Sequence, residues 1–475
     1  MSTTSAPNQS LESAQGWHEL DQEVDAFLSG KTLLRTDEPG ALPIFRPPPL
    51  PTSLSGIGLL EELVRRRTWS AVINLSHELL TSSSSPFAVY YSQLIQGRSD
   101  QDGDISDEMI NEDVLNTIQI IIWRLRAFKY VRRFNDLKME IVRLRLLPSH
   151  IETLPSWVPP LLILEGLESS TYNAGEDQEN VMDSICKMRY ALLKNKGLKD
   201  ELLKLDIVMS NIFVRKEEWR LALATLDDVL LYVEDAVQVW MKNMEIYHLE
   251  THTEVVDLVT CAFKVEIYSR QGRILLQAGA LPEAATVFER AHHTHQTMRD
   301  ENDDLSGAHI STKNSDYITL AIVRNIPTQI LLNEGLLHFA HLDYDLAQEK
   351  FTRAIEMQRR ESIQASQLQS KLSSRNLFYE IEILNSEGNL LIPCLNNLSL
   401  SSLYTCRMHE AVAMLEALIR EDATKYLTEC IAFNLCTMYE LGHDTATSNQ
   451  KKTILHRVAT RFCLDDVGQE CFRLG

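Results

Sequence analysis

The sequence predicts an all-α protein, a tetratricopeptide-type α-solenoid of stacked helical hairpins. The segment from Leu281 to Ala291 has the pattern of the second helix of such a hairpin, with Ala284, Phe288 and Ala291 at the close-packing positions. The same spacing returns elsewhere in the chain, as a solenoid requires, because one hairpin cannot bury its apolar faces alone. Sustained apolar/polar alternation with a period of two, the mark of strands, is not found.

Four segments carry this signature, each with a small residue twelve positions before its first alanine. The pairs are Ser210 with Ala222, Gly272 with Ala284, Gly335 with Ala347, and Ser399 with Ala411. Successive alanines are 62, 63 and 64 residues apart, whereas simple hairpins in tandem repeat about every 34 residues. We therefore expect a mixture of degenerate helical elements and long connections between the hairpins.

The composition predicts three parts: a mostly disordered N-terminal segment at 1–52, N-terminal helical hairpins at 53–197, and the tetratricopeptide solenoid at 198–475. The first part ends in a proline run, interpreted as a rigid spacer. It also holds one possible short helix from Trp17 to Leu28, with apolar residues on one face. Such a helix is suited to dock on the array or on a partner.

The helices of the second part follow from their apolar spacing. Leu59 to Leu80 predicts a first hairpin, which the serine run at 81–86 ends. Further helices are expected at about 109–127 and 131–147, after Pro159-Pro160, and from Val181 to Leu192. From 198 onward the pattern is almost continuously helical.

Composition excludes several classes of protein. A hydrophobic content of 44% and a charged content of 24% are typical of an ordered soluble chain. The formal charge of −20 argues against binding nucleic acid through its backbone. We find neither a secretory signal at the N-terminus nor an apolar run of the ~20 residues that span a bilayer. Eight cysteines without a Cys-x-x-Cys pair are expected to be small buried residues.

The motifs that resemble catalytic or ligand sites are incomplete. Ser29-Gly30-Lys31-Thr32 ends like a phosphate-binding loop, but Asp25 stands where the first glycine is required. The pair His248 and His252 lacks a correctly placed glutamate, and the histidines at 292, 293 and 295 lack a carboxylate or thiolate set. We therefore predict no catalytic residue, no cofactor, no metal and no enzymatic activity.

Two surfaces are candidates for binding partners. In tetratricopeptide arrays the first helices line a concave groove, and its positions here are largely apolar, with Leu332, Leu336 and Phe339 in one hairpin and Leu400 and Leu403 in another. We expect a helix to cover this groove, either from this chain or from a partner.

The second candidate is a basic stretch. Between residues 124 and 145 eight basic residues face only two acidic ones, and Arg132 and Arg133 lie at its centre. The stretch is either an ordinary solvated helix face or a docking patch for an acidic partner or an anionic membrane.

The C-terminal run from Ile431 to Leu441, with Lys451-Lys452, Cys471 to Leu474 and Asn396-Asn397-Leu398, resembles the tetratricopeptide-repeat subunits of the transport protein particle (TRAPP) complex. The resemblance implies a non-catalytic scaffold subunit of a multisubunit vesicle-tethering and Rab guanine nucleotide exchange complex in ER-to-Golgi traffic. It implies other TRAPP subunits as partners, and only indirect contact with the Rab GTPase. It also implies a cytoplasmic location, peripheral at the ER-Golgi intermediate compartment and Golgi, with membrane association through the complex.

The alternative is a stand-alone peptide-binding tetratricopeptide adaptor or co-chaperone. Such proteins hold a terminal carboxylate with lysines and asparagines in the groove, and the apolar groove positions favour the scaffold instead.

Overall fold

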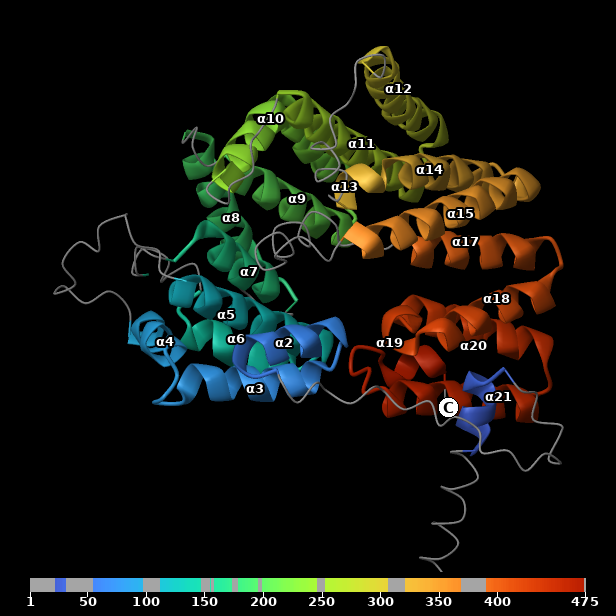
Figure 1. The fold of residues 1–475 in the computed structure, drawn as a ribbon, viewed down its shortest axis with the longest axis horizontal. Coiled ribbons are helices and arrows are strands. Elements are labelled where there is room, and N and C mark those ends of the chain that lie inside the picture. The colour runs from blue at the N-terminus through green and yellow to red at the C-terminus, as the bar shows by residue number, and fades with distance from the viewer. Residues whose placement is uncertain are drawn as a thin grey trace, which may run out of the picture. The chain divides into compact units, whose positions relative to one another are not determined.

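The computed structural model describes ten stretches of the chain. They are residues 22–30, 54–96, 112–146, 154, 158–172, 178–194, 199–245, 253–305, 321–368 and 390–473. Within these stretches every regular element is a helix, so the all-α prediction is confirmed (Figure 1). None of the helices in the described residues is both long enough and apolar enough to cross a membrane.

The chain forms two compact units. Unit 1 combines the two ends of the chain, residues 1–144 and 407–475, and unit 2 comprises residues 145–406. The boundaries of these units differ from the predicted divisions at 52/53 and 197/198. Those divisions rest on sequence pattern and stay a prediction.

The N-terminal part of unit 1 holds five labelled helices. They are α2 (Gly56–Arg65), α3 (Trp69–Thr81), α4 (Phe87–Gln96), α5 (Glu112–Tyr130) and α6 (Phe134–Arg143). The consecutive residues Ile120, Ile121 and Ile122 of α5 are all 0% exposed, so α5 is buried on several sides and forms the centre of this part. The expected hairpin at 59–80 and the expected helices near 109–127 and 131–147 correspond to α2 with α3, α5 and α6.

The C-terminal part of unit 1 contains α18 (Met408–Glu421), α19 (Ala423–Tyr426), α20 (Glu429–Gly442), α21 (Thr445–Arg461) and the 3-10 helix η4 (Gln469–Phe472). Side chains cap three of these helices: Asp422, Thr428 and Asp444 accept hydrogen bonds from backbone N–H groups of the first turn.

A further helix of unit 1, at residues 22–28, lies against this C-terminal part with Val24 and Leu28 buried. It ends at Gly30, whose φ of +70° is the left-handed conformation of a helix C-terminus. Gly30 thus ends a helix, whereas the glycine of a phosphate loop leads into one. The rest of the predicted helix, from Trp17 to Asp21, lies outside the described residues.

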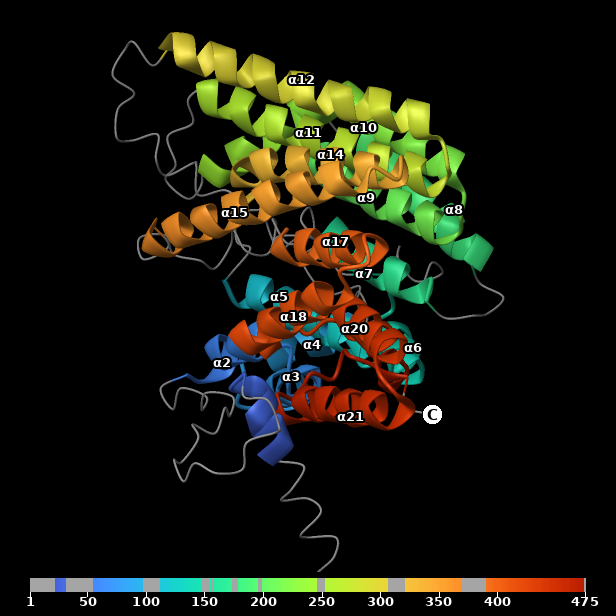
Figure 2. The same ribbon diagram turned by 90° about the vertical axis from the view of Figure 1, so that its right-hand side faces the viewer.

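Unit 2 begins with α7 (Pro160–Ser170), α8 (Gln178–Lys194), α9 (Lys199–Arg215), α10 (Trp219–Glu245), α11 (Thr253–Gln277) and α12 (Leu281–Leu305). It continues with α13 (Ala321–Arg324), α14 (Ile326–Ala340), α15 (Tyr344–Leu368) and α17 (Leu391–Tyr404). The pairs α9/α10, α11/α12 and α14/α15 are helical hairpins, and successive pairs pack on one another (Figures 1 and 2). Pro160 is the first residue of α7, as expected for a proline at a helix start.

The alanine signatures mark the close-packing positions. Ala222, Ala284, Ala347 and Ala411 are all 0% exposed. A Cβ atom added to Gly272 would stand 2.1 Å from the Phe288 ring, and one added to Gly335 would stand 2.4 Å from the Phe351 ring. In these two hairpins the phenylalanine therefore fills the space that the missing side chain leaves.

The other two signatures differ from these. In the α9/α10 hairpin the hydroxyl of Ser210 donates a hydrogen bond to the Ala222 carbonyl at 3.3 Å. The Ser399 and Ala411 signature is split, because Ser399 belongs to unit 2, Ala411 to unit 1, and the boundary falls between Cys406 and Arg407.

The long spacing between signatures has a cause that the sequence analysis did not anticipate. The helices are themselves long: α10 has 27 residues, and α11, α12 and α15 have 25 each. Only residues 246–252 separate α10 from α11. The expectation of an intervening degenerate element is therefore wrong between Ala222 and Ala284, where helix length accounts for the spacing.

The cysteine prediction is only partly correct. Cys394, Cys436 and Cys471 are buried, but four others are exposed: Cys186, Cys406, Cys430 and Cys463. Exposed positions on amphipathic helices and turns tolerate a small side chain such as cysteine. No pattern in the sequence distinguishes the exposed cysteines from the buried ones.

Candidate partner-binding surfaces

The predicted groove positions of unit 2 do not share one environment. Leu332 is 1% exposed and belongs to the core, whereas Leu336, Phe339, Leu400 and Leu403 are partly exposed. The surface that a partner can reach therefore lies toward the C-terminal ends of α14 and α17.

Polar side chains explain why the first half of this groove is closed. The amide of Asn333 donates to the Ser269 hydroxyl at 2.7 Å and accepts from Gln329 at 3.0 Å, and all three side chains are buried. This chain of hydrogen bonds joins α14 to α11. Positions that were expected to line an open groove therefore pack α14 against α11, which are the first helices of two successive hairpins.

Aromatic rings mark the part of the groove that stays accessible. We call Phe339, Tyr344 and Tyr404 the aromatic cluster. The ring centroids of Phe339 lie 5.3 Å from Tyr344 and 5.6 Å from Tyr404, and the two tyrosines stack at 5.0 Å. Tyr404 is 59% exposed, and Leu342 and Leu346 beside Tyr344 in the sequence are exposed as well. Tyrosine and phenylalanine are enriched at the centre of protein interfaces, so this cluster is the better-formed apolar candidate.

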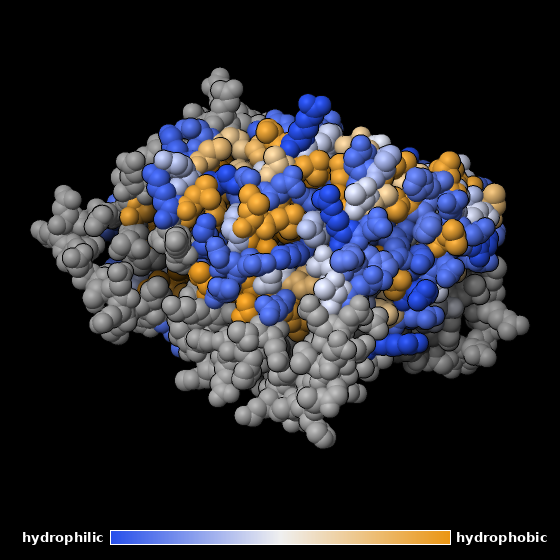
Figure 3. Space-filling model, turned by 90° about the horizontal axis from the view of Figure 1, so that it is seen from above, coloured by the Kyte–Doolittle hydropathy of each residue, from blue (hydrophilic) through white to orange (hydrophobic). Residues whose placement is uncertain are grey.

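Elsewhere on unit 2 the surface is mixed. Viewed from above, over α12 and its neighbours, hydrophobic residues form small groups separated by hydrophilic ones (Figure 3). Such scattered groups are ordinary on a protein surface and do not by themselves mark an interface.

The basic stretch of unit 1 is largely engaged in internal contacts. The Arg124 guanidinium is buried, pairs with Glu140 at 3.0 Å and donates to the Ile73 carbonyl at 2.8 Å. The hydroxyl of Tyr91 donates to the same carboxylate at 2.7 Å. This network ties α3, α4, α5 and α6 together, so Arg124 is structural.

Arg132 and Arg133, the two residues singled out from the sequence, differ from each other. Arg133, the N-cap residue of α6, is exposed, pairs with Asp136 of α6 at 2.6 Å and lies 5.6 Å from the centre of the Phe128 ring. Arg132 stands at the turn between α5 and α6 with φ +59°, and its guanidinium pairs with Glu429 and Glu470 of the C-terminal part. Of these two arginines, Arg133 is therefore the one that can bind an external partner without losing a contact to a distant part of the chain.

A second turn repeats this arrangement. Arg67, between α2 and α3, also has a left-handed backbone, with φ +58°. Its guanidinium pairs with Asp466 at 2.7 Å and donates to the carbonyls of Leu427 at 3.0 Å and Thr424 at 3.2 Å. Together, Arg67 and Arg132 with their partners form a polar seam between the two ends of the chain. This seam was not predicted from the sequence, since residues so far apart in the chain leave no local pattern.

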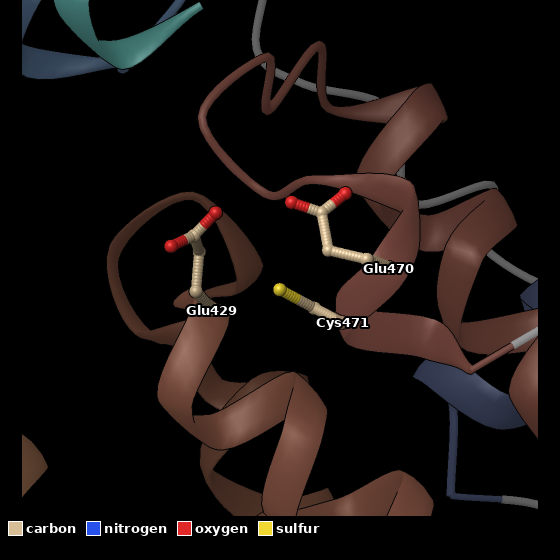
Figure 4. Close-up of side chains that lie close together, drawn as sticks. All are labelled: Glu429, Glu470 and Cys471. Atoms are coloured by element: carbon tan, nitrogen blue, oxygen red, sulfur yellow. The ribbon is translucent and has the colours of Figure 1, made fainter. Parts of the chain in front are cut away.

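Where α20 begins and η4 ends, three groups able to bind a metal lie close together. The ligand atoms of Glu429, Glu470 and Cys471 lie within 4.8 Å of one another, and the side chains point into a common space (Figure 4). Arg132 balances both carboxylates, and the backbone N–H of Gly468 donates to Glu429 at 3.3 Å. Burial, and next the negative charge of Glu429, raise the pKa of the Cys471 thiol. The pairs that the two carboxylates form with Arg132 show that this group contributes to the seam.

A small cavity of about 210 Å³ lies among α18, α20 and α21. Its polar wall includes Glu416, His443 and Lys451. The Glu416 carboxylate already accepts from the Tyr439 hydroxyl at 2.8 Å and pairs with Arg420 at 2.6 Å and Lys451 at 3.5 Å. Burial, followed by the charges of Lys451 and His409, lowers the pKa of His443. The cavity is smaller than the ~300–1,000 Å³ of typical small-molecule sites, and its charges are paired.

Comparisons with known proteins agree with the resemblance seen in the sequence. No protein-family model matches the chain. Trafficking protein particle complex subunit 12 of Homo sapiens is 22% identical over 437 residues, which cover 87% of this chain and 48% of that protein. The Mus musculus protein of the same name is 25% identical over 210 residues, 44% of this chain and 19% of that protein.

The chain thus spans about half the length of the human relative, and the shorter segment matched to the mouse relative spans about a fifth of that protein. The similarity to the human protein extends over most of this chain, including segments in both units. The resemblance predicted from the sequence is confirmed: this all-α chain is similar to subunit 12 of the trafficking protein particle (TRAPP) complex.

Proposed function

We propose that the chain is a non-catalytic scaffold subunit of a multisubunit vesicle-tethering and Rab guanine nucleotide exchange complex in ER-to-Golgi traffic. The observation that carries the proposal is the similarity to TRAPP complex subunit 12 over 87% of the chain. Stacked helical hairpins support it, because such arrays present extended surfaces to other proteins.

A structural role is also supported by how the polar groups are used. In the described part of unit 1, two groups of carboxylates are engaged in ion pairs. Arg132 pairs with both Glu429 and Glu470, and Glu416 is held by Arg420, Lys451 and the Tyr439 hydroxyl. Groups committed to such pairs stabilise packing and are poor candidates for acid–base catalysis.

The partners we propose are other subunits of the complex, with the Rab GTPase contacted only indirectly. The aromatic cluster with Leu336, Leu400 and Leu403 is the first proposed contact surface, and Arg133, which precedes α6, is the second. Membrane association is proposed to be peripheral and through the complex, at the ER-Golgi intermediate compartment and Golgi.

Affinity purification of the tagged full-length chain from its native cells, followed by quantitative mass spectrometry, tests the proposal. We expect the other subunits of the tethering complex in a stable stoichiometric ratio that resists 0.5 M salt, which screens weak electrostatic contacts. Recovery of a chaperone or of short-motif proteins without tethering subunits would instead support the stand-alone adaptor.

A surface variant makes the same experiment specific. Tyr404→Asp with Leu336→Asp places charges on the proposed apolar surface, and we expect at least a tenfold loss of subunit recovery. Leu231→Asp is the matched control, because Leu231 on α10 is 85% exposed and lies outside that surface. Equal recovery for both variants would remove the aromatic cluster from the proposal while leaving the subunit assignment intact.

A further inference from the structure

The helix at residues 22–28 packs against the C-terminal helices of unit 1 (beside α21 in Figures 1 and 2). We call the surface of α18 and α21 that it contacts the seat. Val24 and Leu28 stand one turn apart on this helix and are 1% and 5% exposed. The seat therefore contains apolar space for two side chains at helical spacing.

Side chains from α18 and α21 contact the polar groups of the seated helix. Arg461 of α21 pairs with the Asp25 carboxylate, and the amide of Gln450 on the same helix donates to Glu23 at 2.7 Å. Both acidic side chains of this short helix thus meet a donor on α21.

Arg420 of α18 contacts the end of the seated helix in two ways. Its Nε donates to the Phe27 carbonyl at 2.7 Å, and its guanidinium lies 4.9 Å from the centre of the Phe27 ring. The Phe27 carbonyl also accepts from the Gly30 N–H at 3.1 Å, so Arg420 adds a second, charged donor to a carbonyl in the last turn of the helix.

Contacts within unit 1 hold Arg420 in place. Glu416, one turn earlier on α18, pairs with Arg420 at 2.6 Å and accepts from the Tyr439 hydroxyl at 2.8 Å. A side chain already oriented in this way loses little freedom when a helix docks, which favours binding.

The described part of the seated helix, residues 22–28, has two turns. Two turns contribute little helix stability of their own, so the contacts with α18 and α21 hold this part in its conformation. Residues 31–55 connect it to α2, so its occupancy of the seat benefits from a high effective concentration.

We propose that α18 and α21 form a binding site for a short acidic amphipathic helix of a partner protein, and that residues 22–30 occupy this site in its absence. The ligand carries carboxylates at the Glu23 and Asp25 positions, aliphatic side chains at the Val24 and Leu28 positions, and an aromatic ring at the Phe27 position. This inference rests on contacts inside unit 1 and does not depend on the proposed function.

The test uses the full-length chain and a fluorescent peptide with the sequence of residues 17–30. Val24→Asp with Leu28→Asp empties the site in the chain itself, and Gln22→Ala, at an exposed position of the same helix, is the control. We expect the emptied chain to bind the peptide at least tenfold more tightly than the wild-type and Gln22→Ala chains. Circular dichroism checks that all three chains have the same helix content.

A charge exchange shows that the peptide binds at the proposed seat. Adding Arg461→Glu to the emptied chain should weaken binding at least tenfold, and a peptide with Asp25→Arg should recover it. A longer peptide, in which two helical turns of Ala, Glu and Lys replace Ser29-Gly30, should bind even the wild-type chain more tightly than the original peptide does.

Several results would overturn the proposal. They are absence of binding to the emptied chain, equal binding to wild-type and emptied chains, and binding that Arg461→Glu leaves unchanged. A concentration-dependent dimer of the wild-type chain that Val24→Asp with Leu28→Asp abolishes would assign the seat to a second copy and overturn the partner assignment.

Discussion

At the scale of single residues, the pair Gly335 and Phe351 determines how closely α14 and α15 approach. Phe351 is 0% exposed, and its ring fills the space beside Gly335. We expect Phe351→Ala to destabilise this region by about 3–5 kcal/mol, since it removes a buried ring and leaves a cavity. Thermal melting and hydrogen exchange in α14 and α15 measure the effect.

Two further variants make that measurement interpretable. Leu231→Ala, at a side chain 85% exposed on α10 of the same unit, should change stability by less than about 0.5 kcal/mol. Gly335→Ala should destabilise by about 1–3 kcal/mol through overpacking against Phe351. Wild-type exchange in α14 and α15 of the Phe351→Ala chain would contradict the close-packing role of the ring.

The cysteines provide a prediction about reactivity. Burial raises the pKa of the Cys436 thiol to about 12, so at pH 8 only about one molecule in ten thousand carries the reactive thiolate. We expect iodoacetamide to label the exposed Cys406 and Cys463 in the native chain, and to label Cys436 only after denaturation. Peptide mass spectrometry after a timed reaction gives the rate at each site. Equal native rates at Cys436 and Cys463 would show that the core around α20 opens readily.

At the scale of elements, the turn between α5 and α6 gives a prediction that separates two adjacent arginines. Arg132→Glu places a third negative charge beside Glu429 and Glu470, and we expect a loss of about 1–2 kcal/mol from broken pairs and new repulsion. Arg133→Glu disturbs two local contacts, the exposed pair with Asp136 and the approach of the guanidinium to the Phe128 ring, and should stay within about 0.5 kcal/mol. Chemical denaturation of the two single variants compares them directly.

A glycine substitution separates the charge effect from the backbone effect. Arg132→Gly loses the same ion pairs but suits the left-handed backbone at φ +59°. It should therefore be less destabilising than Arg132→Ala, which loses the pairs and keeps the strain. If Arg132→Glu and Arg133→Glu destabilise equally, the pairs with Glu429 and Glu470 contribute nothing to stability.

The elements themselves were largely predictable. Alternating small and large residues at helical spacing located the hairpins around Gly272 and Gly335, because close packing leaves a local mark in the sequence. The lengths of α10, α11, α12 and α15 were not predicted, since a helix that continues past the hairpin crossing adds no further signature. The apolar face at Val24 and Leu28 indicated a docking helix, but Arg420 and Arg461, which hold it, had no distinguishing pattern.

The candidate surfaces were less predictable than the fold. The spacing of Leu332, Leu336 and Phe339 placed them on one helix. Leu332 nevertheless lies in the core, whereas Leu336 and Phe339 are partly exposed. That difference depends on the Asn333 contact with Ser269 of α11, 64 residues earlier. Arg132 likewise acquires its role from residues about 300 positions later, a relation that no local pattern records.

At the scale of the whole molecule, unit 1 is assembled from the two ends of the chain, and Arg67 is the most connected residue of its polar seam. The Arg67 and Asp466 side chains are only 17% and 14% exposed, so their contact is shielded from water. Two backbone carbonyls, of Thr424 and Leu427, depend on the same guanidinium. We expect Arg67→Ala to destabilise unit 1 by about 1.5–3 kcal/mol, since a charged donor leaves several acceptors unpaired.

The decisive measurement is hydrogen exchange on both sides of the seam. If Arg67 joins the chain ends, Arg67→Ala should raise exchange around α2 and α3 and also around α19 and the start of α20, regions separated by more than 340 residues in the sequence. Asp466→Asn should give a weaker form of the same pattern. The double variant should lose less free energy of unfolding than the sum of the two single variants, because both substitutions remove the same Arg67–Asp466 pair. Arg65→Ala is the matched control, since Arg65 is exposed and pairs only locally with Glu62 on its own helix. Increased exchange confined to α2 and α3 would mean that the seam contributes no cooperativity and that each end of the chain is stable without the other.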